Sequence, residues 1–139
     1  AENACGKNRE FRDDLVPNCI FTNPEIGSVG LTEEQCKERG ISYNIGRFPF
    51  AALGKAMVIG ETSGFCKVIS DKESDQILGV HIIGPHATDL ISEAVTAMNL
   101  EITSAELGNA IHAHPTLAES VMEAAHDAHK KSAHIPYRK

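Results

Sequence analysis

Two neighbouring segments in the middle of the chain constrain its fold more than any other feature. Residues 64–70 and 76–83 are rich in apolar and β-branched side chains, and the polar stretch 71–75 separates them. This spacing predicts two strands joined by a short hairpin loop, which makes the strands antiparallel neighbours. Gly84 and Pro85 follow the second segment and should end it. The sequence therefore predicts an antiparallel sheet around this hairpin.

The first half of the chain contains two more predicted strands. Residues 18–21 and 42–51 carry β-branched and aromatic side chains, and Pro49 places the second strand at a sheet edge or makes it end there. Between them, residues 23–30 contain one proline and two glycines, and we expect a turn-rich loop. Residues 53–59 fit either a helical turn or a connector.

Helix starts are marked by capping boxes, in which a threonine is followed three residues later by glutamine or glutamate. The chain contains three of them, at Thr32–Gln35, Thr103–Glu106 and Thr116–Glu119. Gly40 and Gly108 should end the first two helices. Apolar residues at helical spacing predict a further long helix from residue 87, namely Leu90, Ile91, Ala94, Val95 and Met98.

Strands in the first part of the chain and helices in the second are typical of an α+β fold. We expect an antiparallel β-sheet with helices packed on one face. The predicted last helix carries an alanine-rich face. Such a face fits core packing or a contact with another subunit, and the sequence leaves both interpretations open.

The stretch from Ile111 to Glu119 contains the candidate chemistry. His114 precedes Pro115, and a residue before proline is disfavoured in helical geometry, so the imidazole should lie just outside the last helix. Pro115 suits the first helical position, and Glu119 should lie about one turn inside. An imidazole at a chain corner with a carboxylate close enough to orient it is suited to general acid–base chemistry.

Other interpretations of these residues stay open at this point. Glu119 completes a capping box and would then bind the backbone N–H of Thr116 instead of His114. His112 and His114 would point the same way in an extended segment, but a metal site needs further ligands. The last helix and the tail carry a second set of candidate metal ligands, namely Glu123, His126, His129 and His134. These side chains could converge on a metal ion or form a solvated face.

Four ordered segments together carry a resemblance to a known family. They are residues 16–32, 64–69, 77–87 and 112–119. This set resembles the C-terminal part of the flavin-dependent pyridine nucleotide-disulfide oxidoreductases. Glutathione, trypanothione and mercuric reductases share the fold of this family. The sequence of residues Ala113–Leu117 resembles the lipoamide branch of the family more than the glutathione branch.

The resemblance implies a domain organisation and partners. Residues 16–131 would be the dimerisation domain, residues 1–15 a linker from a missing FAD-binding domain, and residues 132–139 a C-terminal tail. The implied partners are a second copy in a homodimer, the missing FAD- and NAD-binding domains of the same chain, and the lipoyl domain of 2-oxo acid dehydrogenase complexes. The implied location is the cytoplasm, or the mitochondrial matrix in a eukaryote.

The resemblance also implies chemistry, in which electrons pass from dihydrolipoamide through a cysteine pair and FAD to NAD. The family's base corresponds to His114 and its carboxylate to Glu119, both acting in the partner subunit's active site. The backbone of His114 and Pro115 would lie near the partner's FAD, across a cis peptide bond, and His112 would be structural or close to the flavin. Because the chain has neither a GxGxxG turn nor a CxxxxC pair, we expect the chain alone to be inactive and to bind no flavin tightly.

Composition limits the alternatives. With 19 acidic and 13 basic residues and a net charge of −6, the chain has no basic stripe for nucleic acid. It also has no apolar run long enough to span a membrane. Its four cysteines lack CxxC spacing and are interpreted as separate reduced thiols, without a metal site. A stand-alone dimerisation or scaffold module stays as the alternative function.

Overall fold

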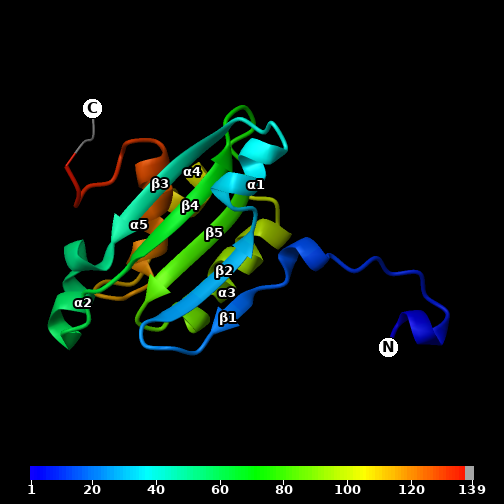
Figure 1. Cartoon of the computed structure of the whole chain (residues 1–139), viewed down its shortest axis with the longest axis horizontal. Helices are drawn as coiled ribbons and strands as arrows, with labels where there is room; N and C mark the ends of the chain where they lie inside the picture. Colours follow the sequence, from blue (N-terminus) through cyan, green and yellow to red (C-terminus); the bar gives the residue numbers. More distant parts are fainter. Residues whose placement is uncertain (137–139) are drawn as a thin grey trace.

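A five-stranded antiparallel sheet forms the centre of the molecule (Figure 1). The computed structural model describes residues 1–136. The strand order is β1-β2-β5-β4-β3, with bounds β1 Asn18–Ile20, β2 Glu25–Gly30, β3 Tyr43–Pro49, β4 Phe65–Asp71 and β5 Ile77–Gly84. The predicted hairpin is confirmed, because β4 and β5 are paired antiparallel, and Pro49 ends the edge strand β3.

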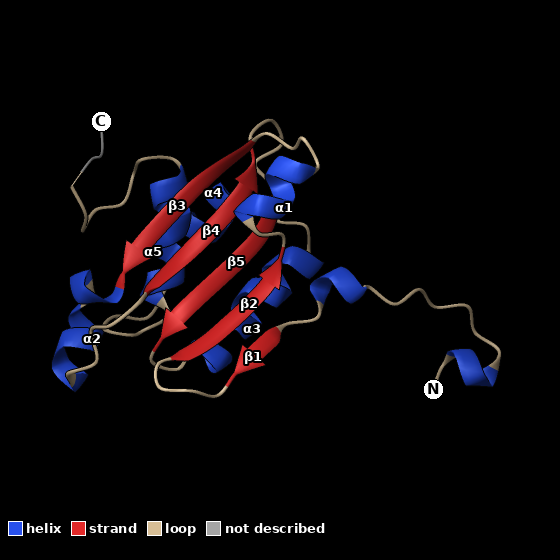
Figure 2. Cartoon of the chain, in the orientation of Figure 1, coloured by secondary structure: helices blue, strands red, loops and turns tan. Residues whose placement is uncertain are grey.

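The two long helices cover one face of this sheet (Figure 2). The helices are α1 Glu33–Glu38, α2 Gly54–Ile59, α3 Ala87–Asn99, α4 Ser104–Asn109 and α5 Glu119–Ala128. Helix α3 packs on β2 and β5, α5 packs on β3 and β4, and α4 packs against α5. The α+β prediction is therefore confirmed. The short helix α1 lies over the other face, where Glu33 Oε1 is 2.7 Å from Nζ of Lys67.

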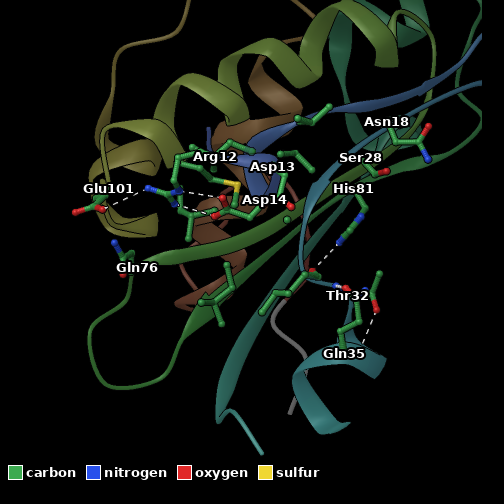
Figure 3. A pocket seen from close by; sticks show the side chains of 18 of the residues that line it. Arg12, Asp13, Asp14, Asn18, Ser28, Thr32, Gln35, Gln76, His81 and Glu101 are labelled. Carbon is green, nitrogen blue, oxygen red and sulfur yellow. Dashed lines mark hydrogen bonds and ion pairs between the residues drawn. The ribbon is translucent and has the colours of Figure 1, made fainter. Parts of the chain in front are cut away.

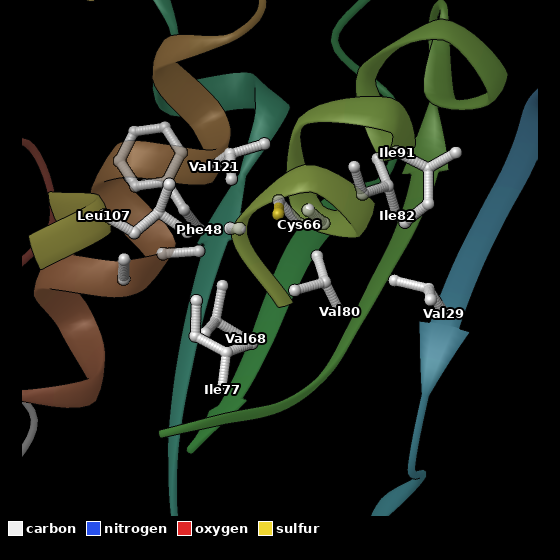
Figure 4. Packing of buried hydrophobic residues seen from close by; sticks show 14 of the residues in the cluster. Val29, Phe48, Cys66, Val68, Ile77, Val80, Ile82, Ile91, Leu107 and Val121 are labelled. Atoms are coloured by element: carbon white, nitrogen blue, oxygen red, sulfur yellow. The ribbon is translucent and has the colours of Figure 1, made fainter. Parts of the chain in front are cut away.

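The hydrophobic core lies between the sheet and the two long helices (Figure 4). Side chains at every second strand position meet side chains from the helices, as expected for a sheet with one buried face. The buried members labelled in the figure are Val29, Phe48, Cys66, Val68, Ile77, Val80, Ile82, Ile91, Leu107 and Val121. Burial of this apolar surface is the main stabilising contribution and fixes both long helices on the sheet.

The prediction of a loop over residues 23–30 is wrong, because residues 25–30 form β2 between β1 and β5. Its glycines obscured the alternating pattern of a strand. A Cβ at Gly27 would collide with the carbonyl of Ala87 and lie 3.0 Å from Cβ of Ile91. Glycine is used here so that α3 can approach the strand closely.

The N-terminal segment lies apart from this core. Residues 1–14 are exposed, and the first part of this segment extends away from the sheet (Figure 1), whereas Leu15 packs into the core. Gly6 ends a short turn in left-handed geometry. The division of the chain at residues 15 and 131 stays a prediction. Within the described residues, the four cysteines form no disulfide, and no helix is long and apolar enough to cross a membrane.

Candidate active site

The candidate site lies on the connection between α4 and α5. This connection, residues 110–118, has neither helix nor strand, and the peptide bond between His114 and Pro115 is cis, as the resemblance implied. The prediction that Pro115 opens the last helix is wrong, because α5 begins at Glu119. The turn before the helix is closed by a side chain, since the N–H of Thr116 donates to Glu119 Oε2 at 2.8 Å.

The structure brings His114 and Glu119 together. Nδ1 of His114 is 2.8 Å from Oε1 of Glu119. The His114 side chain is 75% exposed, and the Glu119 side chain is 12% exposed. Among the described residues, Nε2 of His114 has no hydrogen-bond partner. The ring is therefore oriented by a buried carboxylate on one side and accessible to a reacting molecule on the other.

The capping role and the pairing role of Glu119 are not alternatives. Oε1 binds His114, and Oε2 binds the N–H of Thr116. The box is only half formed, because the Thr116 hydroxyl donates to the Ala113 carbonyl instead of capping the helix. The other two boxes are complete, at Thr32–Gln35 and Thr103–Glu106. The carboxylate thus fixes both the turn and the imidazole.

The electrostatic environment keeps Glu119 ionised. Burial pushes the pKa of Glu119 upward, and the hydrogen bonds from Thr116 N–H and His114 push it downward. Positive charge on His114 and His134 acts in the same direction as these bonds, and the pKa lies below its ordinary value of 4.5. Because the carboxylate is bonded to Nδ1, Nε2 is the ring nitrogen left without a hydrogen-bond partner among the described residues.

This lowered pKa predicts how stability depends on pH. A carboxyl whose pKa is depressed by folding stabilises the fold above the unfolded-state value, and this contribution is lost as pH falls through the folded-state value. We expect the unfolding free energy to fall below pH 4.5 and to fall less steeply in Glu119→Gln. Urea unfolding at several acidic pH values measures this. Glu34→Gln, on the exposed side of α1, is the control, and an equal flattening there would contradict the prediction.

Ser120 next to the pair predicts an unusual mutational result. Its side chain is fully buried, and its hydroxyl has no hydrogen-bond partner among the described residues. A buried unpaired hydroxyl costs about 1–3 kcal/mol. Ser120→Ala should therefore leave the unfolding free energy unchanged or raise it, measured by urea unfolding. Ser104 is equally buried, but its hydroxyl donates to Asp75 Oδ1 at 2.6 Å, so Ser104→Ala should destabilise by about 1–3 kcal/mol.

His112 does not lie on the exposed surface beside His114. Its side chain is 7% exposed, and its Nε2 is 2.7 Å from Oε1 of Glu93 on α3. Its Nδ1 is 2.9 Å from the carbonyl oxygen of Ala110. The two histidines therefore form no metal pair with each other. Sequence reasoning missed Glu93, because nothing in its position on α3 distinguishes it from a solvated acid.

The residues along α5 and the tail that could have converged on a metal ion do not come together. They bind different partners: Glu123 binds Ser132, the N–H of Ala133 and His134, while His129 binds Asp75 and Ser104, and His126 packs on Gly108. No group of three metal-ligating residues occurs in the described part of the chain. Burial pushes the pKa of Glu123 upward, but the bonds from Ser132, His134 and Ala133 hold it below the ordinary value. Glu123 thus attaches the C-terminal tail to α5.

A groove of about 720 Å³ lies away from the His–Glu pair, lined by residues 12–16, β2, β5 and the end of α3 (Figure 3). Several of its polar groups bind groups of the same chain. Arg12 donates to both carboxylate oxygens of Asp14 at 2.9 and 2.8 Å, and His81 Nε2 is 2.9 Å from the Leu31 carbonyl. Burial lowers the pKa of His81. The groove therefore contributes no group to the candidate site.

Comparison with known proteins places this chain in a family. The pyridine nucleotide-disulphide oxidoreductase dimerisation domain matches residues 16–125. The chain is 54% identical over 121 residues to the dihydrolipoyl dehydrogenase of Bacillus subtilis, covering 87% of this chain and 26% of the relative. It is 47% identical over 135 residues to the dihydrolipoyl dehydrogenase of Thermus scotoductus, covering 97% and 29%.

A solved structure agrees with these relatives. LpdA from Mycobacterium tuberculosis superposes with a TM-score of 0.82 at 26% identity, over 88% of this chain and 27% of that chain. The chain thus spans less than a third of the length of the relatives it matches. Because the family match covers the whole sheet and reaches into α5, the chain belongs to the dimerisation-domain family of the pyridine nucleotide-disulphide oxidoreductases.

Proposed function

We propose that this chain is the dimerisation domain of a dihydrolipoyl dehydrogenase, which oxidises dihydrolipoamide and reduces NAD+. In this proposal His114 and Glu119 are the acid–base pair of the partner subunit's active site. The observation that carries the proposal is the 2.8 Å contact between His114 Nδ1 and the buried Glu119 carboxylate, with the rest of the ring exposed. The names of the relatives support lipoamide as the substrate class.

The proposed role follows from thiol chemistry. Only a thiolate attacks a disulfide, and a free thiol has a pKa of about 8.5, so a dithiol substrate needs a base at neutral pH. Nε2 of His114 would accept the thiol proton, while Glu119 would stabilise the imidazolium that forms. The same imidazolium would return the proton to a departing thiolate in the next step.

The cofactors of the full-length enzyme in this proposal are FAD and NAD. FAD supplies the two-electron transfer between the dithiol and NAD+. His114 and Pro115 are both exposed. Their exposure supports contact with a flavin that is bound by the partner subunit. No Gly-rich phosphate-binding turn is present in the sequence, so the cofactors would be held by other domains.

The proposed enzyme would have partners and a cellular location typical of its relatives. The dimerisation-domain family supports a homodimer. Within the same longer chain, FAD- and NAD-binding domains would complete each subunit, and a lipoyl domain of a 2-oxo acid dehydrogenase complex would deliver the substrate. Relatives from Arabidopsis thaliana and Pisum sativum are named as mitochondrial enzymes. We therefore propose the cytoplasm, or the mitochondrial matrix in a eukaryote.

Sequencing the coding DNA upstream of Ala1 tests this proposal. We expect the reading frame to continue back through a GxGxxG turn and a CxxxxC pair, which hold the dinucleotide and the redox disulfide. A start codon directly before Ala1 would contradict the proposal. The chain would then be a stand-alone dimerisation or scaffold module. An upstream sequence typical of glutathione or mercuric reductases would keep the fold and change the substrate.

A further inference from the structure

The connection that carries His114 has few backbone contacts of its own. Among the described residues, no N–H group of residues 111–117 donates to a backbone carbonyl. Side chains therefore determine its conformation. The contact of Glu119 with His114 fixes one end of this connection to α5. Near the other end, His112 contacts Glu93 of α3.

His112 links this connection to α3. Its Nε2 is 2.7 Å from Oε1 of Glu93, and its Nδ1 is 2.9 Å from the carbonyl oxygen of Ala110. Each ring nitrogen therefore contacts an oxygen atom of a different part of the chain. The His112 side chain is 7% exposed and the Glu93 side chain is 32% exposed, and a contact that is partly shielded from water is held more firmly than a fully exposed pair.

The two anchors of the connection lie on different halves of the sheet. Glu93 belongs to α3, which packs on β2 and β5, and Glu119 belongs to α5, which packs on β3 and β4. His112 and His114 are separated by one residue, so a shift at the first moves the second by a similar amount. Misplacement of a catalytic group by about 1 Å can reduce the rate about 100-fold.

We propose that His112 and Glu93 form a positioning pair that sets the place of His114 in the partner's active site. This inference rests on the proposed function of His114. His112 itself does not touch the reacting atoms, because its ring is buried and both of its nitrogens bind groups of this chain. The pair acts on catalysis only through the geometry of the connection.

Two substitutions of His112 separate its two contacts. The amide nitrogen of asparagine occupies about the place of Nδ1, so His112→Asn keeps the contact with Ala110 and loses Glu93. The amide of glutamine reaches the place of Nε2, so His112→Gln keeps the contact with Glu93. In the full-length enzyme with dihydrolipoamide and NAD+, we expect His112→Asn to lower kcat about 10-fold or more. We expect KM to change less than kcat, and His112→Gln to restore most of kcat.

Further variants keep the test decisive if asparagine disturbs folding. Glu93→Ala removes the same contact from α3, and the double variant with His112→Asn should lose no more rate than either single change. His86→Asn is the matched control, because His86 lies at the start of α3, pairs with Asp89 at 3.5 Å and is 64% exposed. Its positive φ of 55° also suits asparagine.

The outcomes separate this inference from the proposed function. A kcat within twofold of wild type in His112→Asn, or additive losses in the double variant, would overturn the positioning pair. If His114→Gln were also fully active, the proposed function would fail with it. If His114→Gln were inactive while His112→Asn kept full kcat, only the positioning pair would fail.

Discussion

Replacing His114 by glutamine is expected to slow the oxidation of dihydrolipoamide by NAD+ about 10²- to 10⁴-fold in the full-length enzyme. Glutamine places a neutral amide near the position of Nε2, and this amide cannot accept a thiol proton at neutral pH. The His114 side chain is 75% exposed, so its loss removes little packing. Steady-state turnover of dihydrolipoamide measures this effect. Flavin absorbance of the purified variant shows whether the FAD-binding domain is intact.

The control for this prediction is another exposed histidine. His86→Asn removes an imidazole that pairs with Asp89 at 3.5 Å on α3, and it should leave turnover unchanged. A His114→Gln enzyme with more than about a tenth of wild-type turnover would contradict the assignment of His114 as the base. Equal losses in both variants would point to a general effect on folding.

Replacing Gly46 by alanine is expected to destabilise the fold by about 3 kcal/mol or more. A Cβ at Gly46 would collide with the Ala124 carbonyl oxygen and the Ala128 backbone nitrogen of α5. Both are backbone atoms and cannot rotate away, so the helix would have to move off β3. The N–H of Arg47 donates to Asp127 at 2.8 Å at the same place, and this bond would be strained or lost. Urea unfolding measures the change.

The matched control is Gly54→Ala in α2. No atom lies within 4 Å of a Cβ built at Gly54, and its backbone needs no left-handed conformation. Alanine there should raise the unfolding free energy by about 0.4–1 kcal/mol. Because α5 carries Glu119, the Gly46→Ala variant should also lose part of its turnover. If the Gly46→Ala chain were as stable as wild type, α5 would be able to shift away from β3 without loss, which would contradict the close packing of α5 on Gly46.

The sequence predicts the sheet and the helices wherever the local signals agree. The 64–83 hairpin is marked by two apolar runs around a polar loop, and the Thr32 and Thr103 boxes are complete in the structure. Residues 25–30 were predicted wrongly because close packing of α3 requires Gly27. That requirement comes from tertiary structure and has no local signal in the sequence.

The candidate site is only partly predictable, because some of its contacts join residues that lie far apart in the sequence. The spacing of His114 and Glu119 indicates the pair, but a carboxylate has two oxygens and serves the cap and the imidazole together. The contact between His112 and Glu93 joins residues 19 positions apart. Neither periodicity nor spacing indicates such a contact. The sequence left a metal site or a solvated face open for Glu123 and His129, and it does not indicate that they bind groups from the tail and from the β4–β5 loop.

The most direct test of the account is a heterodimer of two inactive full-length chains. One chain would carry His114→Gln, and the other would lack a cysteine of its own redox pair. If His114 acts across the dimer, a heterodimer purified through two different tags has one complete site and should show about half of wild-type turnover per dimer. An inactive heterodimer, with both homodimers also inactive, would show that His114 acts within its own subunit or in no thiol chemistry, and would contradict the account.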